Sequence, residues 1–191
     1  MMNEKKIKEQ LEKQLDKKRM EHTEGVAYTA AALAMRYGVD VDKAYLAGLL
    51  HDCAKCIDKK KQYALCEKYG LELSESEKDN SSLVHAKLGA FLAKEKYCVE
   101  DEDILSAVLY HTTGRENMTM LEKIIFVADY VEPGRKPITG LDEIRALIFI
   151  DIDAAIYRIL RNTIGFLEEN EKTIDARSRN ALLYYEKFTK N

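Results

Sequence analysis

Four histidines and two aspartates are the side chains of this sequence best suited to chemistry, because most of them border apolar helical runs. His51 and Asp52 follow the apolar run 44–50, and Asp129 closes another at 124–128. The other histidines, at or near the edges of similar segments, are His22, His85 and His111. Imidazole nitrogens and carboxylate oxygens bind borderline divalent metals. The pattern therefore predicts one metal centre assembled from several helices.

The elements that must position these groups are helices, because apolar residues recur at helical spacing along nearly the whole chain. Only two prolines interrupt the pattern, and strand-like runs are scarce. The expected helices cover about residues 7–15, 26–37, 42–52, 59–69, 82–92, 101–111, 119–129, 142–169 with a break near Asp151, and 175–187. The expected N-caps are Asp42, Ser81 or Ser82, and Asp101, while Thr119 and Glu122 fit a capping box.

An all-α bundle with the metal site at converging helix ends is the expected fold. Adjacent helical residues point about 100° apart, so His51 and Asp52 cannot both face a core squarely. They can converge on one ion that lies beside a helix terminus. We expect residues 1–191 to form a single domain, with helices at 1–18 and 171–191 packed on it.

The composition is that of an ordinary globular protein and excludes several classes of partner. A net charge of −3 provides no field that would attract nucleic acid or an anionic membrane. No apolar stretch approaches the roughly 20 residues of a membrane span. Residues 1–19 lack the apolar centre of a signal peptide. We therefore expect a cytoplasmic protein, and the sequence leaves its oligomeric state open.

Cys53 and Cys56 form a C-x-x-C pattern that has more than one interpretation. A redox motif would need a helix that starts after a strand, whereas this pair follows the end of an expected helix. A structural zinc site would need a second pair, which the sequence does not contain. Reduced, buried or half-buried thiols are therefore the preferred interpretation.

The order of the candidate ligands, His22, then His51-Asp52, then Asp129, resembles that of the HD-domain phosphohydrolase superfamily. Five segments narrow the resemblance: RMEHTEGV at 19–26, HDCAK at 51–55, VHA at 84–86, HTTG at 111–114 and ADYVEPGR at 128–135. Together they are similar to the bacterial YqeK-type family, the HD-domain bis(5'-nucleosyl)-tetraphosphatases (symmetrical). The similarity covers roughly residues 15 to 180.

This resemblance implies an HD-domain fold and a metal-dependent phosphoanhydride hydrolase. The expected reaction is hydrolysis of diadenosine tetraphosphate, or a related dinucleoside polyphosphate, to two molecules of ADP. The expected cofactor is a divalent metal, with iron favoured and one ion tightly bound. The ligand set that the resemblance implies is His22, His51, Asp52 and Asp129.

Two residues are expected to act in catalysis. Asp52 can orient the attacking water and accept its proton, since a bound metal lowers the pKa of water from about 16 towards 7. Lys55 follows Asp52 by three residues, so its cation can neutralise a phosphate oxygen beside the metal. His85 and His111 have two alternative roles: they hold a second metal, or they donate hydrogen bonds to substrate phosphate. Phosphate contact with one metal is the preferred role.

Further substrate contacts are expected in three places. Thr112 follows His111 in a loop whose hydroxyls and backbone N–H groups suit an anion. Arg135 leaves the expected metal-bearing helix, and its guanidinium can bind phosphate in a bidentate manner. Thr173 and Arg177 begin the last helix, where N–H groups and arginines can receive a phosphate or a ribose.

Two other functions remain open at this point, as does a purely structural helical protein that would bind no metal. The first is an HD-type nucleotidase or deoxynucleotide phosphohydrolase that acts on an ADP- or GDP-like mononucleotide with similar ligands. The second is a metal-binding module that senses nucleotides without hydrolysing them; such a module would be expected to lose ligands, and the sequence retains them all.

Overall fold

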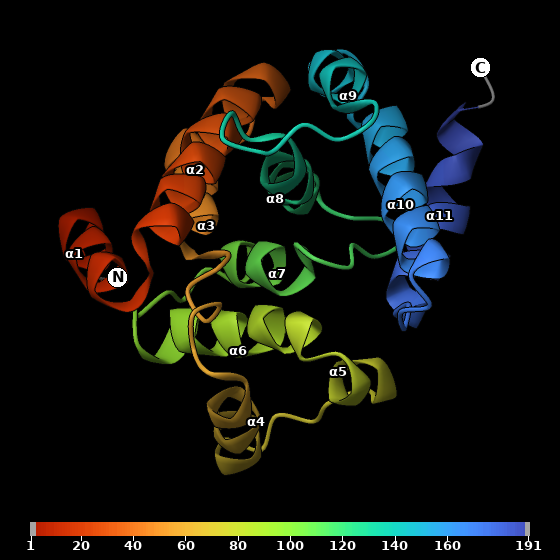
Figure 1. The fold of residues 1–191 in the computed structure, drawn as a ribbon. Helices are drawn as coiled ribbons and strands as arrows, with labels where there is room; N and C mark the ends of the chain where they lie inside the picture. The colour runs from red at the N-terminus through yellow and green to blue at the C-terminus, as the bar shows by residue number, and fades with distance from the viewer. Residues whose placement is uncertain (1–2, 190–191) are drawn as a thin grey trace.

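The computed structural model describes residues 3–189, which form helices and no strand. The expected all-α fold is confirmed (Figure 1). The elements are α1 (Glu4–Gln14), α2 (Lys17–Tyr37), α3 (Val41–Leu50), α4 (Lys59–Lys68), α5 (Glu75–Asp79), α6 (Ser81–Glu95), α7 (Glu102–Tyr110), α8 (Met120–Val131), α9 (Leu141–Leu147), α10 (Ile152–Glu169), α11 (Ala176–Glu186) and the 3-10 turn η1 (Lys187–Thr189).

Helix α8 is the central element of the bundle. It contacts α2, α3, α7 and α10, and Figure 1 shows it surrounded by them. Its apolar residues are fully buried on several sides, as Ile124, Ile125 and Val127 illustrate. Burial on this scale stabilises the helix strongly, since each buried aliphatic side chain contributes about 1.5–3 kcal/mol. Asp129, two residues after Val127, is therefore held on a rigid core helix.

Helices α2 and α3 pack unusually closely because small residues line their contact. A Cβ added at Gly48 of α3 would lie only 2.6 Å from the Cα of Ala27 in α2. Ala27, Ala30 and Ala34 are all fully buried along this face of α2. The close approach fixes the position of His22, on α2, relative to His51, at the end of α3.

Two of the four expected N-caps are confirmed. Asp101 caps α7, and Thr119 forms a capping box with Glu122 at the start of α8. The expected break near Asp151 separates α9 from α10, and the Asp151 side chain caps α10. The expected N-cap Asp42 was wrong. Asp40 caps α3 instead, because its side chain accepts the backbone N–H of Lys43.

Two further corrections concern the segment between α4 and α6. Asn80, not Ser81 or Ser82, caps α6, because its side-chain oxygen accepts the Ser82 N–H. The short helix α5 was not expected. It has its own capping box, formed by Ser74 and Glu77.

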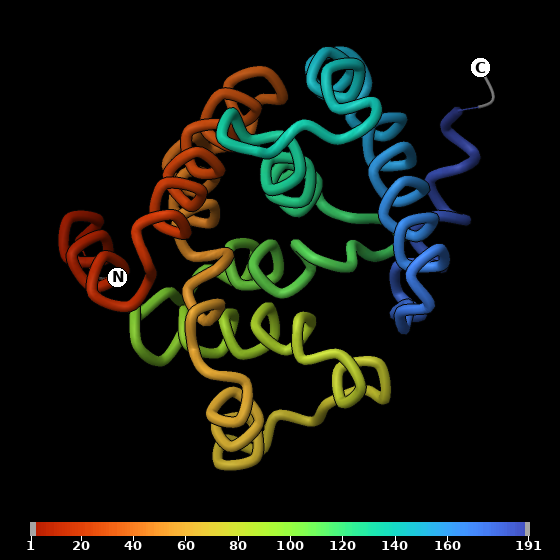
Figure 2. The backbone as a smooth tube through the Cα atoms, viewed as in Figure 1, coloured from red at the N-terminus to blue at the C-terminus, as the bar shows by residue number. Residues whose placement is uncertain are grey.

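The terminal helices both contribute to the hydrophobic core. Ile7 and Leu11 of α1 are fully buried, as are Ala181 and Tyr185 of α11. Figure 2 shows that these two helices lie on opposite sides of the bundle. The single domain 1–191, with terminal helices at 1–18 and 171–191, stays a prediction, and residues 1–2 and 190–191 lie outside the described range. Among the described helices, none combines the length and apolarity needed to cross a membrane.

Candidate metal centre

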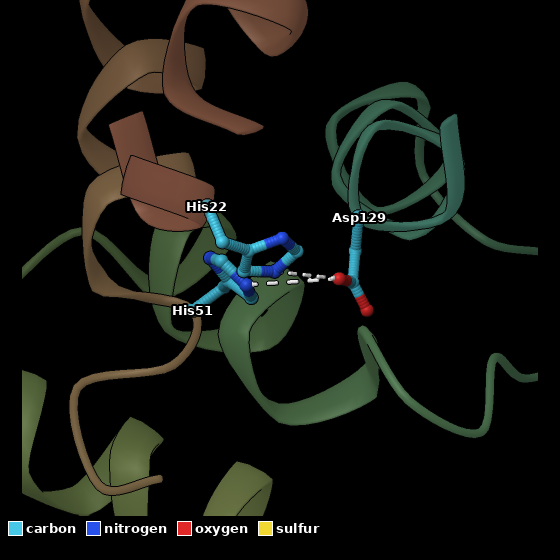
Figure 3. A group of neighbouring side chains, drawn as sticks. All are labelled: His22, His51 and Asp129. Carbon is cyan, nitrogen blue, oxygen red and sulfur yellow. Dashed lines mark ion pairs between the residues drawn. The ribbon is translucent and has the colours of Figure 1, made fainter. Parts of the chain in front are cut away.

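Three of the four predicted metal ligands come from different parts of the bundle and point towards one another. Figure 3 shows His22 from α2, His51 from the end of α3 and Asp129 from α8. The Nε2 atom of His22 lies 3.0 Å from Oδ1 of Asp129. The Nε2 atom of His51 lies 3.9 Å from the same oxygen. One ion could therefore contact all three side chains.

Asp52, the fourth predicted ligand, lies between two groups of imidazoles. Its Oδ2 atom is 3.4 Å from Nε2 of His51 and 3.8 Å from Nε2 of His22. Its Oδ1 atom is 3.0 Å from Nε2 of His85 and 3.6 Å from Nε2 of His111. Because α3 ends at Leu50, the chain turns at positions 51 and 52, and the two adjacent side chains can converge. This is the helix-terminus geometry that the sequence predicted.

The Nδ1 atom of each histidine has a partner that faces away from the centre. Three of them contact the carbonyl oxygen three residues earlier: His51 with Gly48 O at 2.6 Å, His85 with Ser82 O at 2.6 Å and His111 with Val108 O at 2.7 Å. A carbonyl oxygen only accepts hydrogen bonds, so Nδ1 must carry the proton in these three rings. A neutral ring then directs an Nε2 lone pair into the cluster.

This arrangement of acceptors fits a metal cation. Three buried atoms of the cluster have no hydrogen-bond partner among the described residues: Nε2 of His22, Nε2 of His51 and Oδ1 of Asp52. An unpartnered buried polar atom costs about 1–3 kcal/mol. Imidazole nitrogens that face carboxylate oxygens also repel one another unless a cation lies between them. Nitrogen and oxygen donors of this kind are those of zinc, iron and related divalent ions.

The ionisation of the cluster follows from its burial and its charges. Burial opposes a charge on Asp52, but His51, His111 and His85 outweigh it and hold its pKa well below the usual range. Burial also opposes protonation of His51, yet the nearby Asp52 raises the pKa of His51. For His85 burial dominates and lowers the pKa to about 4. Without a bound anion His85 is therefore neutral at physiological pH, as a metal ligand requires.

Three cationic side chains surround the cluster. A guanidinium nitrogen of Arg19 lies 2.6 Å from Oδ2 of Asp52, and one of Arg135 lies 3.1 Å from Oδ1 of Asp129. The Lys55 ammonium lies 3.3 Å from Nε2 of His85, and burial lowers the pKa of this lysine. The structure thus brings Lys55, His85 and Arg135 to the cluster as the sequence analysis expected.

The other expected substrate contacts lie in different surroundings. Thr112 is half-buried and directly follows His111. Thr173 is exposed in the segment before α11. Arg177 lies in the first turn of α11, where its guanidinium contacts Asp175 at 3.0 Å and Glu77 at 2.9 Å. The substrate roles of Thr112, Thr173 and Arg177 stay predictions.

Sequence reasoning gave no role to two residues of the centre, Arg19 and Glu132. The Glu132 carboxylate lies 3.0 Å from Nδ1 of His22. Each lies one helical turn from a predicted ligand: Arg19 precedes His22 by three residues, and Glu132 follows Asp129 by three. Residues at this spacing share a helix face, so the spacing could have identified both. Cys53, in contrast, is not available as a ligand, because its thiol faces Gly89 O and burial raises its pKa to about 12.

Comparisons with known proteins agree with this geometry. The HD domain family model matches residues 19–134, a segment that contains the four predicted ligands. Two relatives are named bis(5'-nucleosyl)-tetraphosphatase, symmetrical. The Bacillus subtilis protein is 42% identical over 86% of this chain and 87% of its own. The Staphylococcus aureus protein is 39% identical over 96% of this chain and 95% of its own.

The chain belongs to the HD-domain family of symmetrical bis(5'-nucleosyl)-tetraphosphatases. A crystal structure supports the fold of this family for the chain. It comes from a Clostridium acetobutylicum protein described as a predicted HD superfamily hydrolase involved in NAD metabolism. That protein is 40% identical, and the superposition has a TM-score of 0.94 over 98% of this chain and 99% of the other. The HD-domain bundle expected from the sequence is therefore confirmed.

Proposed function

We propose that this protein is a metal-dependent hydrolase that cleaves diadenosine tetraphosphate, or a related dinucleoside polyphosphate, symmetrically to two molecules of ADP. One observation carries the proposal: imidazole nitrogens from four elements converge on Asp52, with Asp129 beside them and arginine and lysine cations around them. The membership of the chain in the symmetrical tetraphosphatase family supports the same substrate and cleavage position.

The metal ligands in this proposal are His22, His51, Asp52 and Asp129, and iron is the proposed metal. When bound, a divalent ion supplies an activated water at neutral pH and neutralises charge on the phosphate. The chemistry of the donors supports a divalent ion, because two imidazoles and two carboxylates match the ligand types of such sites. As a ligand, Asp52 is placed to orient the attacking water and to accept its proton.

His85 and His111 face the second oxygen of the Asp52 carboxylate, away from His22 and His51. We assign them to the phosphate chain of the substrate, whose negative charge would favour a proton on Nε2 of these rings in place of the lone pair, with one tightly bound metal at the other oxygen. A second ion held by these two imidazoles is the competing assignment. Counting metal ions per chain in the wild type and in His85→Ala separates the two: an unchanged count supports phosphate contact.

The cations around the cluster suit a polyphosphate. The centre has three cations and three carboxylates. The cations are Arg19, Lys55 and Arg135, and the carboxylates are Asp52, Asp129 and the nearby buried Glu132. A divalent ion would therefore give the centre a net positive charge. A nucleoside diphosphate is a good leaving group, so we expect positioning and charge neutralisation by these side chains to provide most of the rate enhancement.

Symmetrical cleavage requires the central anhydride to lie at the metal, with one ADP half bound at a fixed distance from it. We assign Thr112, Thr173 and Arg177 to the nucleotide portion of the substrate. We also propose that the enzyme acts in the cytoplasm. Its four cysteines, all within the described range, form no disulfide, which agrees with a reducing compartment. Because the proposed substrate is a dinucleoside polyphosphate, we propose small nucleotides as its partners, rather than nucleic acids or membranes.

Product analysis after turnover of diadenosine tetraphosphate by metal-replete enzyme tests this function. We expect ADP as the sole nucleotide product, in a ratio of two per substrate consumed. Formation of AMP plus ATP would contradict symmetrical cleavage. Turnover of mononucleotides alone would favour the nucleotidase alternative, and nucleotide binding without turnover would favour a sensing module.

A further inference from the structure

His22 differs from the other three histidines in the partner of its Nδ1 atom. His51, His85 and His111 each use a backbone carbonyl three residues earlier. His22 instead contacts the carboxylate of Glu132, with 3.0 Å between Nδ1 and Oε1. A carboxylate is a stronger acceptor than a carbonyl, because it carries a full negative charge. The difference therefore concerns the strength of the contact as well as its geometry.

The surroundings of Glu132 hold its carboxylate in place. The side chain is only 4% exposed, and the residue ends α8 as its C-cap. Its second oxygen, Oε2, accepts the backbone N–H of Gly134 at 2.5 Å. On the side of α2, a Cβ added at Gly25 would lie 2.7 Å from this oxygen. Glycine at position 25 thus leaves the space that the carboxylate occupies beside His22.

We propose that Glu132 is a positioning residue for the metal ligand His22, an inference that rests on the proposed metal centre. Its carboxylate keeps the proton of His22 on Nδ1, so that the Nε2 lone pair faces Asp129 and the metal. Its negative charge also makes Nε2 of His22 a stronger electron-pair donor to the metal. Removing such an outer partner of a ligating histidine typically costs about 10- to 100-fold in metal affinity.

A purely structural role for Glu132, as the end of α8, is the alternative to exclude. Glu122 provides a matched control at the other end of the same helix. It is also almost fully buried, and it also accepts a backbone N–H, that of Thr119 at 2.8 Å. Its charged partner is Arg115, at 3.0 Å, and it contacts none of the four histidines in the described residues. Glutamine at either position removes one buried charge without changing size.

The test measures the binding of Co²⁺ to metal-free protein, by competition with a chelator and by the absorption spectrum of the bound ion. The variants are Glu132→Gln, Glu122→Gln and Gly25→Ala. The last keeps every polar group and displaces the Glu132 carboxylate by steric contact. Thermal unfolding of each metal-free variant, followed by circular dichroism, measures its stability separately.

We expect Glu132→Gln and Gly25→Ala to raise the dissociation constant for Co²⁺ about tenfold or more and to shift its absorption bands. Glu122→Gln should lower the unfolding temperature and leave the Co²⁺ affinity within about twofold of the wild type, because it lies outside the centre. Wild-type affinity in both Glu132→Gln and Gly25→Ala would overturn the inference. So would an equal loss in Glu122→Gln. A wild-type chain that takes up no Co²⁺ would instead overturn the metal centre itself.

Discussion

A methyl group at position 48 tests whether the contact between α2 and α3 sets the spacing of the metal ligands. In Gly48→Ala the new Cβ would lie 2.6 Å from the Cα of Ala27 and 3.0 Å from its nitrogen. Non-bonded carbon atoms prefer about 3.5–4.0 Å, so the two helices must separate by about 1 Å. His22 lies on α2. His51 directly follows α3, and its Nδ1 donates a hydrogen bond to the Gly48 carbonyl oxygen. Separating the two helices therefore moves the two ligands apart.

The expected effect is small on stability and large on activity. Overpacking lowers the free energy of unfolding by about 1–3 kcal/mol. The better helix propensity of alanine offsets about 1 kcal/mol of this loss. A net loss of about 1 kcal/mol lowers the unfolding temperature by about 2–4 °C in a chain of this size. A displacement of about 1 Å at the reacting groups can reduce turnover about 100-fold.

The assay compares the turnover number and the unfolding temperature of Gly48→Ala with those of Gly165→Ala. Gly165 also lies within a helix, α10, but a Cβ there would meet nothing within 4 Å. Gly165→Ala should therefore gain about 1 kcal/mol in stability and keep wild-type turnover. Wild-type turnover in Gly48→Ala would refute the reasoning, as would a loss of turnover no greater than its loss of folded protein.

Three other changes have defined outcomes. Removal of metal by a chelator should abolish hydrolysis and lower the unfolding temperature, because the unpartnered acceptors of the cluster then face one another. Added Fe²⁺ should restore both activity and stability. An unchanged unfolding temperature would count against the metal centre. Lys55→Met should reduce the turnover number by about 100-fold in steady-state assays while the metal content per chain stays the same. Burial opposes ionisation of Glu77, but hydrogen bonds from Lys87, the Ser74 N–H and Arg177 outweigh it and lower the pKa of Glu77. Ionised Glu77 therefore stabilises the fold at pH values above the carboxyl pKa of the unfolded chain. This stabilisation is lost as the pH falls through the lower pKa that Glu77 has in the folded protein. Urea unfolding should show Glu77→Gln less stable than the wild type by about 1–3 kcal/mol at neutral pH, with the difference closing in acid.

The fold was predictable where side chains cap helices in patterns with a single solution. Thr119 and Glu122 have the spacing of a capping box, and the structure shows both reciprocal bonds. At the start of α3, Asp40 and Asp42 are both good caps, and backbone geometry rather than residue type selects Asp40. The five-residue helix α5 is too short for an apolar periodicity to show. Only its capping box could have indicated it.

The site was predictable in its residue types but not in its contacts. The order of the histidines and aspartates indicated a common centre, because helix ends can converge from distant parts of a chain. Which charges pair across helices depends on the packed geometry. Arg115, for example, follows the expected anion-binding loop, yet its guanidinium contacts the buried Glu122. Arg177 similarly contacts Glu77, which lies 100 residues earlier in the chain.

Metal content and turnover of a variant that lacks both residues of the His51-Asp52 pair test the central claim most directly. Wild-type protein, purified and reconstituted with Fe²⁺, should hold stoichiometric metal and convert diadenosine tetraphosphate to ADP. The double variant His51→Ala, Asp52→Ala removes two of the four proposed ligands from one turn of the chain. We predict that it retains no stoichiometric metal and has no measurable turnover. Stoichiometric metal together with full activity in this variant would contradict the account.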